Sequence, residues 1–265
     1  MEEEIEMLSD TEAIRIEVED RVAVVSLNRP DRLNAINLEL KRGLERALDR
    51  LEADQELRVV ILRGEGRAFC SGGDLSAIQQ KEGMGRPEDL RYSHGILKRI
   101  MNLEQITISA VHGFAMGAGC NLALSTDLVY AASGTKFSQA FTRIGLIPDW
   151  GGMYVLPRLA GIRKAKEWIL FGKPFSAEEA LSLGVLNGIF DPEVLFPEVK
   201  NLARELSKGP WTAIRLAKKI LDKVYPQGLE AVLEAEVESF ARCKETPDFQ
   251  EGLRAFLEKR KPVFK

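Results

Sequence analysis

The sequence has few of the residues that cross-link chains or bind metals. It contains three cysteines, spread over positions 70, 120 and 243, and only two histidines. A count this odd and sparse excludes a disulfide framework and a zinc cluster. Net charge is also low, at −3, with a pI of about 5.7. Because no basic surplus is available to release counterions, we expect no nucleic-acid partner.

Long hydrophobic runs are missing as well. No apolar stretch reaches the roughly 18 residues that a membrane-spanning helix needs. The N-terminal stretch MEEEIEMLSD is acidic and has no apolar segment of a secretory signal. We therefore expect a cytoplasmic protein with no membrane partner. The 265 residues, 45% of them hydrophobic, are enough for one large domain or for a core with an appendage.

Strand and helix patterns alternate through about residue 190. AIRIEV and RVAVVSLN, residues 13–18 and 21–28, predict a hairpin. Leucines at helical spacing predict an amphipathic helix over residues 37–54, and VVILRG after it predicts a buried strand. A helix over 88–103 and strands at ITISAVHG and DLVYAAS complete an α/β pattern.

Residues 192–258 show helical patterns only. One stripe at i, i+3 and i+4 spacing consists of Leu229, Val232, Leu233, Val237 and Phe240. Such a stripe belongs either to the core or to a contact with another subunit. From the sequence alone we favour the core.

Three segments have features of a chemical site. FCSGGD, residues 69–74, follows a strand, and its glycines let backbone N–H groups point at an anion. HGFAMGAGCNLAL, residues 112–124, opens a helix, where unpaired N–H groups favour negative charge. GLIPDWGG, residues 145–152, places the carboxylate of Asp149 in an apolar turn. Two such loops and a carboxylate would suit enolate chemistry, whereas the alternatives are a simple turn and a helix N-cap at Asp149.

Other reactive side chains point to structural roles. Neither His94 nor His112 accompanies a G-x-S-x-G serine, so a Ser-His-Asp hydrolase is not supported. We expect a structural hydrogen bond from His112. No base is visible beside Cys70, and we expect this cysteine to be a small buried packing residue.

Over nearly its whole length the sequence resembles the crotonase superfamily, the enoyl-CoA hydratase/isomerase family. The stretches that match are LNRPDRLNAIN (27–37), GRAFCSGGDL (66–75), AVHGFAMGAGCNLALSTDLVYAA (110–132), FSQAFTRIGLIPDWGG (137–152) and AFLEKRKPVF (255–264). The resemblance implies an α/β fold, a crotonase-type spiral of ββα units with a C-terminal helical trimerisation region. Residues 1–190 would form the core for acyl-CoA binding and catalysis, and residues 191–265 the helical oligomerisation region.

The same resemblance implies the partners and the site. The substrate would be an acyl-CoA thioester, with no metal and no cofactor, because coenzyme A is part of the substrate. The chain would form a homo-oligomer, a trimer or a dimer of trimers. The oxyanion-hole N–H groups would be those of Gly73 and Ala118. Substrate-binding positions would be Arg32, Leu33, Ala35, Ser71, Asp74, Leu75, Asn121, Phe141, Trp150, Phe256 and Lys259. The last two would lie on a C-terminal helix, often a neighbour's, that closes over the CoA.

The sequence departs from the hydratases of this family at both catalytic glutamates. Their places are taken by Asn121 and Phe141, neither of which can accept a proton near neutral pH. In the isomerases and the aromatic-ring branch, an acidic residue acts in the region of Asp149 instead. The run FSQAFTRIGLIPDWGG looks especially like the ring-1,2-epoxyphenylacetyl-CoA isomerases of phenylacetate breakdown. The 4-chlorobenzoyl-CoA dehalogenases, with a nucleophilic aspartate nearby, match less closely.

Three hypotheses follow. In the preferred one, an isomerase, Asp149 removes a proton from an enoyl- or ring-acyl-CoA and returns it to another carbon, with its pKa raised by apolar neighbours. In the second, a hydratase, Asn121 positions water and Asp149 supplies the proton. In the third, the chain is a non-catalytic CoA-binding scaffold. With the isomerase-like context, we favour a catalytic Asp149 over an N-cap.

Overall fold

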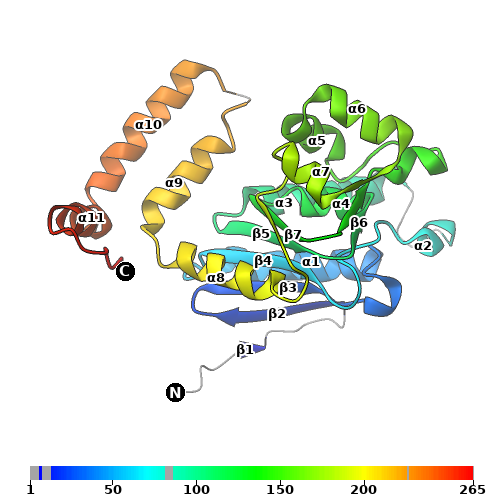
Figure 1. Cartoon of the computed structure of the whole chain (residues 1–265), viewed down its shortest axis with the longest axis horizontal. Helices are drawn as coiled ribbons and strands as arrows, with labels where there is room; N and C mark the ends of the chain where they lie inside the picture. Colours follow the sequence, from blue (N-terminus) through cyan, green and yellow to red (C-terminus); the bar gives the residue numbers. More distant parts are fainter. Residues whose placement is uncertain (1–5, 8–12, 81–85, 226, 265) are drawn as a thin grey trace.

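The main body of the chain is built on a seven-stranded sheet (Figure 1). The computed structural model describes residues 6–7, 13–80, 86–225 and 227–264. Most of the N-terminal stretch on which the absence of a secretory signal was predicted lies outside these ranges. In spatial order the strands are β1 (Glu6–Met7), β2 (Ile14–Glu19), β3 (Val22–Leu27), β4 (Val59–Gly64), β5 (Ile106–Val111), β7 (Leu128–Ala132) and β10 (Gly188–Phe190).

The first strands of this sheet pair antiparallel, and the pairs from β3 to β10 are parallel. The predicted hairpin is therefore confirmed in β2 and β3. Strand β4 is buried on both faces, as expected for a β-branched run in a parallel sheet. Val60 and Leu62 face one hydrophobic core, and Val59 and Ile61 face a second core on the opposite side.

Long helices form the two cores with the sheet. On one side lie α1 (Leu38–Ala53) and α3 (Pro87–Asn102), which confirm the two helices predicted there. The N-cap of α1 is Asn37, whose side chain accepts the Leu40 N–H over 2.9 Å. The opposite side is covered by α8 (Leu195–Ser207). The predicted helical C-terminal part continues with α9 (Trp211–Leu221), α10 (Leu229–Lys244) and α11 (Pro247–Leu257).

A small second sheet and several short helices complete the fold. The sheet consists of β6 (Phe114–Met116), β8 (Lys136–Ser138) and β9 (Pro174–Ser176), and β6 was not predicted from the sequence. The other helical segments are η1 (Pro30–Arg32), α2 (Leu75–Gln79), α4 (Ala118–Ala123), η2 (Ala140–Ile144), α5 (Gly152–Ala160), α6 (Ile162–Phe171) and α7 (Ala177–Ser182). Within the described ranges, no helix is long and apolar enough to cross a membrane.

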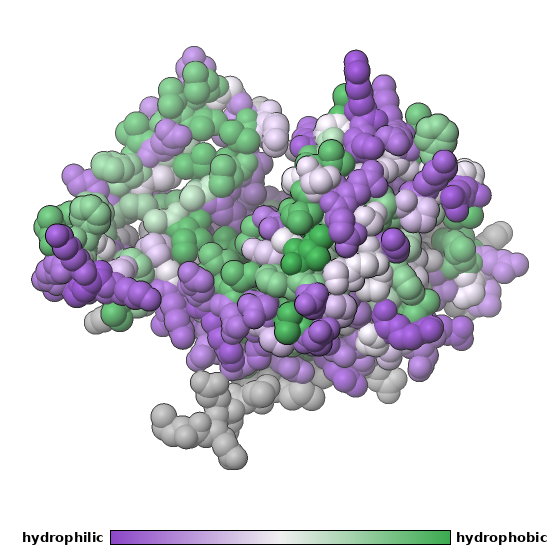
Figure 2. Space-filling view, viewed as in Figure 1, coloured by the Kyte–Doolittle hydropathy of each residue, from purple (hydrophilic) through white to green (hydrophobic). Residues whose placement is uncertain are grey.

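Helices α9 to α11 form an arm that extends away from the sheet (Figure 1). The prediction that the apolar stripe of α10 belongs to the core is wrong. Val237 is 63% exposed and Phe240 is 66% exposed, and none of the described residues of α10 is buried. Figure 2 shows much hydrophobic surface over this arm. Helical spacing identifies an apolar face, but it cannot tell which part of the same chain, if any, covers that face.

Candidate functional site

Two of the predicted site segments are joined by backbone hydrogen bonds. The Ile36 N–H donates to the Gly72 carbonyl over 2.7 Å, and the Asp74 N–H donates back to Ile36 over 2.9 Å. One step earlier, the Ser71 N–H donates to the Leu33 carbonyl over 2.9 Å. The structure therefore brings residues 32–35 and 71–75 together, although about 40 positions separate them in the sequence.

The glycine loop is joined in turn to the loop before α4. The Cys70 N–H donates to Phe114 over 3.1 Å, and the Met116 N–H donates to Cys70 over 2.9 Å. Gly72 has a φ of +97°, and a Cβ placed there would lie 2.6 Å from the Met116 oxygen and 3.7 Å from the Ala118 nitrogen. Only glycine fits this approach, and it sets the two loops side by side.

Both predicted oxyanion-hole amides lie in these loops and are unpaired. The neighbours of Gly73 form the bridge to Ile36, so its own N–H is left out of the pairing. Ala118 is the first residue of α4, after Gly117 with a φ of +52°, and its N–H has no intrahelical acceptor. Within the described part of the chain, neither N–H donates a hydrogen bond. Unpaired backbone amides on adjacent loops are the kind of donors that stabilise a developing oxyanion.

Asp149 is not a helix cap. Helix α5 begins at Gly152 with Gly151 as its N-cap, and no side chain caps it. Asp149 instead has a carboxylate oxygen, Oδ1, that is buried without a hydrogen-bond partner among the described residues. Burial raises the pKa of Asp149 to about 6, against smaller opposing effects of its own backbone N–H and the charge of Lys41. A carboxylate with this pKa is a competent base near neutral pH.

The side chain of Asn121 contacts the backbone of Asp149. It is only 1% exposed, and its Nδ2 donates to the Asp149 carbonyl oxygen over 2.7 Å. Its Oδ1 accepts a hydrogen bond from Gln139 Nε2, also over 2.7 Å. Because Asn121 and Ala118 are both on α4, three residues or about 4.5 Å of helix rise apart, these contacts place the backbone of Asp149 near the beginning of α4.

Two residues at this site were missed by sequence reasoning. Gln139 is fully buried, and Lys41 is 3% exposed although its helix presents charges to solvent elsewhere. Burial lowers the pKa of Lys41, while the charges of Asp89 and Asp149 work to raise it. The signal that was available for Lys41 is its place beside Leu40 on the apolar face of α1. No comparable signal marks Gln139.

The other predicted substrate-binding residues differ in how far they are buried. Phe141 is buried, and its ring lies 3.4 Å from where a Cβ of Gly117 would be. Trp150 is buried with a left-handed φ of +43°. Leu33 and Ala35 are half-buried, as is Ser71, whereas Arg32 and Leu75 are exposed.

Asp74 has a structural role in the glycine loop. Its carboxylate is the N-cap of α2 and forms an ion pair with Arg29 over 3.3 Å. Burial works to raise the pKa of Asp74, but hydrogen bonds from Ser76, the Ala77 amide and Arg29 outweigh burial and lower the pKa. Asp74 is therefore held as an anion and is a poor candidate for proton transfer.

Phe256 and Lys259 do not join the site of their own chain. Phe256 is on α11 and is 81% exposed, and Lys259 follows that helix. Figure 1 shows α11 at the opposite end of the molecule from α2 and α4. Within one chain, therefore, the C-terminal helix does not cover the loops.

The structural roles of two reactive residues are confirmed. The His112 ring, through Nε2, is hydrogen-bonded to the Gly66 carbonyl over 2.8 Å. Cys70 is fully buried, its thiol donates to the Asn34 carbonyl over 3.1 Å, and burial raises its pKa to about 12. A thiol held this strongly in the protonated form is not a nucleophile.

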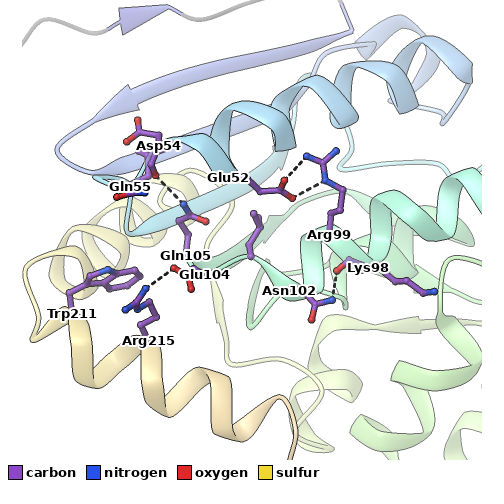
Figure 3. Close-up of a pocket in the computed structure, with 12 residues that line it drawn as sticks. Glu52, Asp54, Gln55, Lys98, Arg99, Asn102, Glu104, Gln105, Trp211 and Arg215 are labelled. Carbon is purple, nitrogen blue, oxygen red and sulfur yellow. Dashed lines mark hydrogen bonds and ion pairs between the residues drawn. The ribbon is translucent and has the colours of Figure 1, made fainter. Parts of the chain in front are cut away.

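Two cavities lie away from the loops. One, of about 680 Å³, opens between α1, α3 and α9. Four of its charged side chains form ion pairs, Glu52 with Arg99 and Glu104 with Arg215 (Figure 3). The other, of about 950 Å³, lies between α3, α5 and α9 behind Gly151. Neither cavity is lined by Gly73 or Ala118, so neither is the candidate site.

Known proteins resemble this chain in sequence and in fold. The family model for enoyl-CoA hydratase/isomerase matches residues 17–265. The 1,2-epoxyphenylacetyl-CoA isomerase of Escherichia coli K12 is 37% identical, over 96% of this chain and 98% of that protein. The crotonyl-CoA hydratase of Syntrophomonas wolfei is 36% identical, again over 96% of this chain and 98% of that protein. The crystal structure of an enoyl-CoA hydratase from Bacillus anthracis aligns with a TM-score of 0.87 at 30% identity, covering 98% of each chain.

Proposed function

The chain belongs to the enoyl-CoA hydratase/isomerase family, with its crotonase fold, and from this premise we propose that it is an isomerase of acyl-CoA thioesters with Asp149 as its acid–base residue. The observation that carries the proposal is the state of Asp149. Its Oδ1 is buried without a hydrogen-bond partner in the described structure, and its pKa is about 6.

The proposed reaction needs one carboxylate and two amides. The thioester oxygen of a 3-enoyl-CoA accepts hydrogen bonds from the Gly73 and Ala118 N–H groups. Asp149 removes a proton from Cα, and the electron pair of the broken C–H bond spreads over the thioester and the double bond as a dienolate. The protonated Asp149 then delivers the same proton to Cγ, which gives the 2-enoyl-CoA. Loss of one oxyanion donor in such a site costs about 10²–10³ in rate.

The residues at the two glutamate places support isomerisation over hydration. Hydration needs a second group that activates water. Phe141 has no polar group, and Asn121 has its amide nitrogen and oxygen hydrogen-bonded to Asp149 and Gln139. Asp74 is held as a capped, paired anion. One carboxylate is sufficient for a proton shuttle because it acts first as a base and then as an acid.

The relatives give this proposal a substrate class and a competitor. The Escherichia coli relative, named a 1,2-epoxyphenylacetyl-CoA isomerase, supports a ring-acyl-CoA of phenylacetate breakdown as the substrate. The Syntrophomonas wolfei relative is named a crotonyl-CoA hydratase and supports hydration instead. The competing activity is therefore hydration of a 2-enoyl-CoA. An enzyme assay distinguishes isomerisation from hydration.

The test offers the purified protein a 3-enoyl-CoA, a ring-acyl-CoA and crotonyl-CoA. We expect double-bond migration in the first or rearrangement of the second, and at most slow loss of the enoyl absorbance with crotonyl-CoA. Turnover should be lost in Asp149→Asn. Rapid hydration of crotonyl-CoA would replace the isomerase proposal by the hydratase. Tight CoA binding without turnover of any of the three would favour a scaffold.

We also propose that the chain forms a homotrimer, alone or as a pair of trimers. The exposed apolar face of α10 and the distance of α11 from its own site support this assembly. In such a trimer, Phe256 and Lys259 of one subunit close over the CoA of another. Light scattering of the purified protein tests the assembly, and a fully active monomer would contradict it.

A further inference from the structure

The hydrogen bonds around Asn121 have a defined direction. A main-chain carbonyl oxygen can only accept, so the Asp149 carbonyl requires the Nδ2 end of the Asn121 amide. The Oδ1 end must then face Gln139, which is forced to present its own Nε2. The order Gln139 to Asn121 to Asp149 is thus the only one that the donors and acceptors allow. We call this chain of two hydrogen bonds the amide relay.

The amide relay carries a stability cost that a purely structural contact does not explain. Gln139 is fully buried, and its Oε1 has no hydrogen-bond partner within the described residues. A buried polar atom that is left without a hydrogen-bond partner lowers the stability of the fold. An apolar pair of similar volume would avoid that cost. A buried arrangement of this kind calls for a role other than stability.

The turn that carries Asp149 needs to be held in place. Trp150 and Gly151 both have left-handed φ angles, +43° and +71°, and for a tryptophan this conformation is unfavourable. At Gly152, a Cβ would lie 2.3 Å from the Asn121 Nδ2. The absence of a side chain at Gly152 is therefore what lets the Asn121 amide reach the Asp149 carbonyl.

From these contacts we propose that Asn121 is a positioning residue for the Asp149 base, oriented by Gln139 and admitted by Gly152. The position that holds a catalytic glutamate in the hydratase pattern then acts here through the backbone, because it fixes the turn from which the carboxylate extends. This inference deepens the proposed function and rests on it for the rate effects, but the contacts themselves do not depend on the substrate.

The test removes each half of the amide relay in the full-length protein. Asn121→Ala deletes the donor to Asp149, and Gln139→Leu deletes the group that orients the amide. We expect kcat to fall by about 10–100-fold in Asn121→Ala and by a smaller factor in Gln139→Leu, with KM within about 3-fold, because misplacement of a base by about 1 Å is enough for such a loss.

Ser125→Ala is the matched control. Ser125 Oγ donates to the Asn121 carbonyl over 2.6 Å, so this variant also removes a buried hydrogen bond from the end of α4 but leaves the Asp149 contact intact. We expect a similar decrease in Tm and an unchanged kcat.

A second readout separates positioning from folding and from the choice of substrate. The pKa of Asp149, followed by ¹³C NMR of labelled aspartate carboxyls, is expected to fall from near 6 toward the ordinary value in Asn121→Ala, because the released turn lets water reach the carboxylate. This measurement stands even where no substrate is turned over, so failure of the isomerase proposal and failure of the amide relay are distinguishable. An unchanged Asp149 pKa, together with kcat losses no larger than those of Ser125→Ala, would overturn the inference.

Discussion

Gly72 lies so close to Met116 that a Cβ on Gly72 would be 2.6 Å from the Met116 carbonyl oxygen. This approach keeps the glycine loop beside the loop of Ala118. The position of the two unpaired amides, and with it the proposed oxyanion hole, therefore depends on a residue that contributes no functional group of its own.

The first prediction concerns that approach. Gly72→Ala forces the loops apart and lowers kcat/KM by about 10²-fold or more, the loss expected when an oxyanion donor is displaced. The matched control is Gly134→Ala, at a φ of +76° but with open space where the Cβ would go. Both variants bear the backbone penalty for a left-handed alanine, and only the first is expected to lose activity in steady-state kinetics. Equal losses would show that the close approach has no part in catalysis.

The second prediction is that removal of the Asp149 charge stabilises the protein while it abolishes turnover. The pKa of Asp149 is raised in the folded state to about 6, above an unfolded value of about 3.9. Protonated Asp149 thus favours folding, an effect fully present below pH 3.9 and lost as the pH rises through about 6. At neutral pH we expect the free energy of unfolding of Asp149→Asn to exceed that of the wild type by about 1–3 kcal/mol, a range that allows for the partial exposure of the side chain.

Urea unfolding at a series of pH values checks whether Asp149→Asn raises or lowers the free energy of unfolding. The stability difference between Asp149→Asn and the wild type should be small near pH 4, grow up to about pH 6 and remain constant above. An Asn variant less stable than the wild type at pH 7 would mean that the carboxylate is held by favourable contacts instead of being desolvated.

The third prediction links Lys41 to the pH dependence of catalysis. The base must be ionised, so kcat/KM should fall on the acidic side with an apparent pKa of about 6. The Lys41 charge lowers the pKa of Asp149, so Lys41→Met should shift this limb to higher pH. Lys98→Met replaces an exposed lysine of α3 and should leave the limb in place. A shift to lower pH in Lys41→Met would show that Lys41 acts mainly through packing.

The fourth prediction concerns the exposed face of α10. Glutamate in place of Val237 and Phe240 puts two charges on an apolar surface that a subunit contact would cover. We expect the double variant to elute as a smaller species. We also expect reduced activity, because Phe256 and Lys259 of the proposed trimer would no longer reach a neighbouring subunit. A matched change of the exposed Glu234 and Glu238 to glutamine should leave the assembly intact. An unchanged elution volume for the first variant would place the interface elsewhere.

Much of the fold could be predicted because local patterns carry it. The continuous apolar runs of β3, β4 and β5 reflect strands that are buried on both faces, and the leucine spacing of α1 reflects burial that repeats with the period of a helix. Short elements such as β6 have only three residues, too few to establish a period. The stripe of α10 shows a further limit, since the same spacing serves a core and an outer face.

The sequence by itself determined the family and the order of its motifs. It also singled out Asp149, because Asn121 and Phe141 cannot transfer protons. Only the tertiary structure decided that Asp149 does not cap α5 and that Lys41 is buried close enough to lower the pKa of Asp149. It also decided that the Asn121 amide donates to the Asp149 backbone carbonyl. These facts depend on contacts between residues that are far apart in the sequence, by 18 positions for Asn121 and Gln139 and by 28 for Asn121 and Asp149. They also depend on the absence of a side chain at Gly152. No periodic pattern records such contacts, because they form only when separate loops are packed against one another.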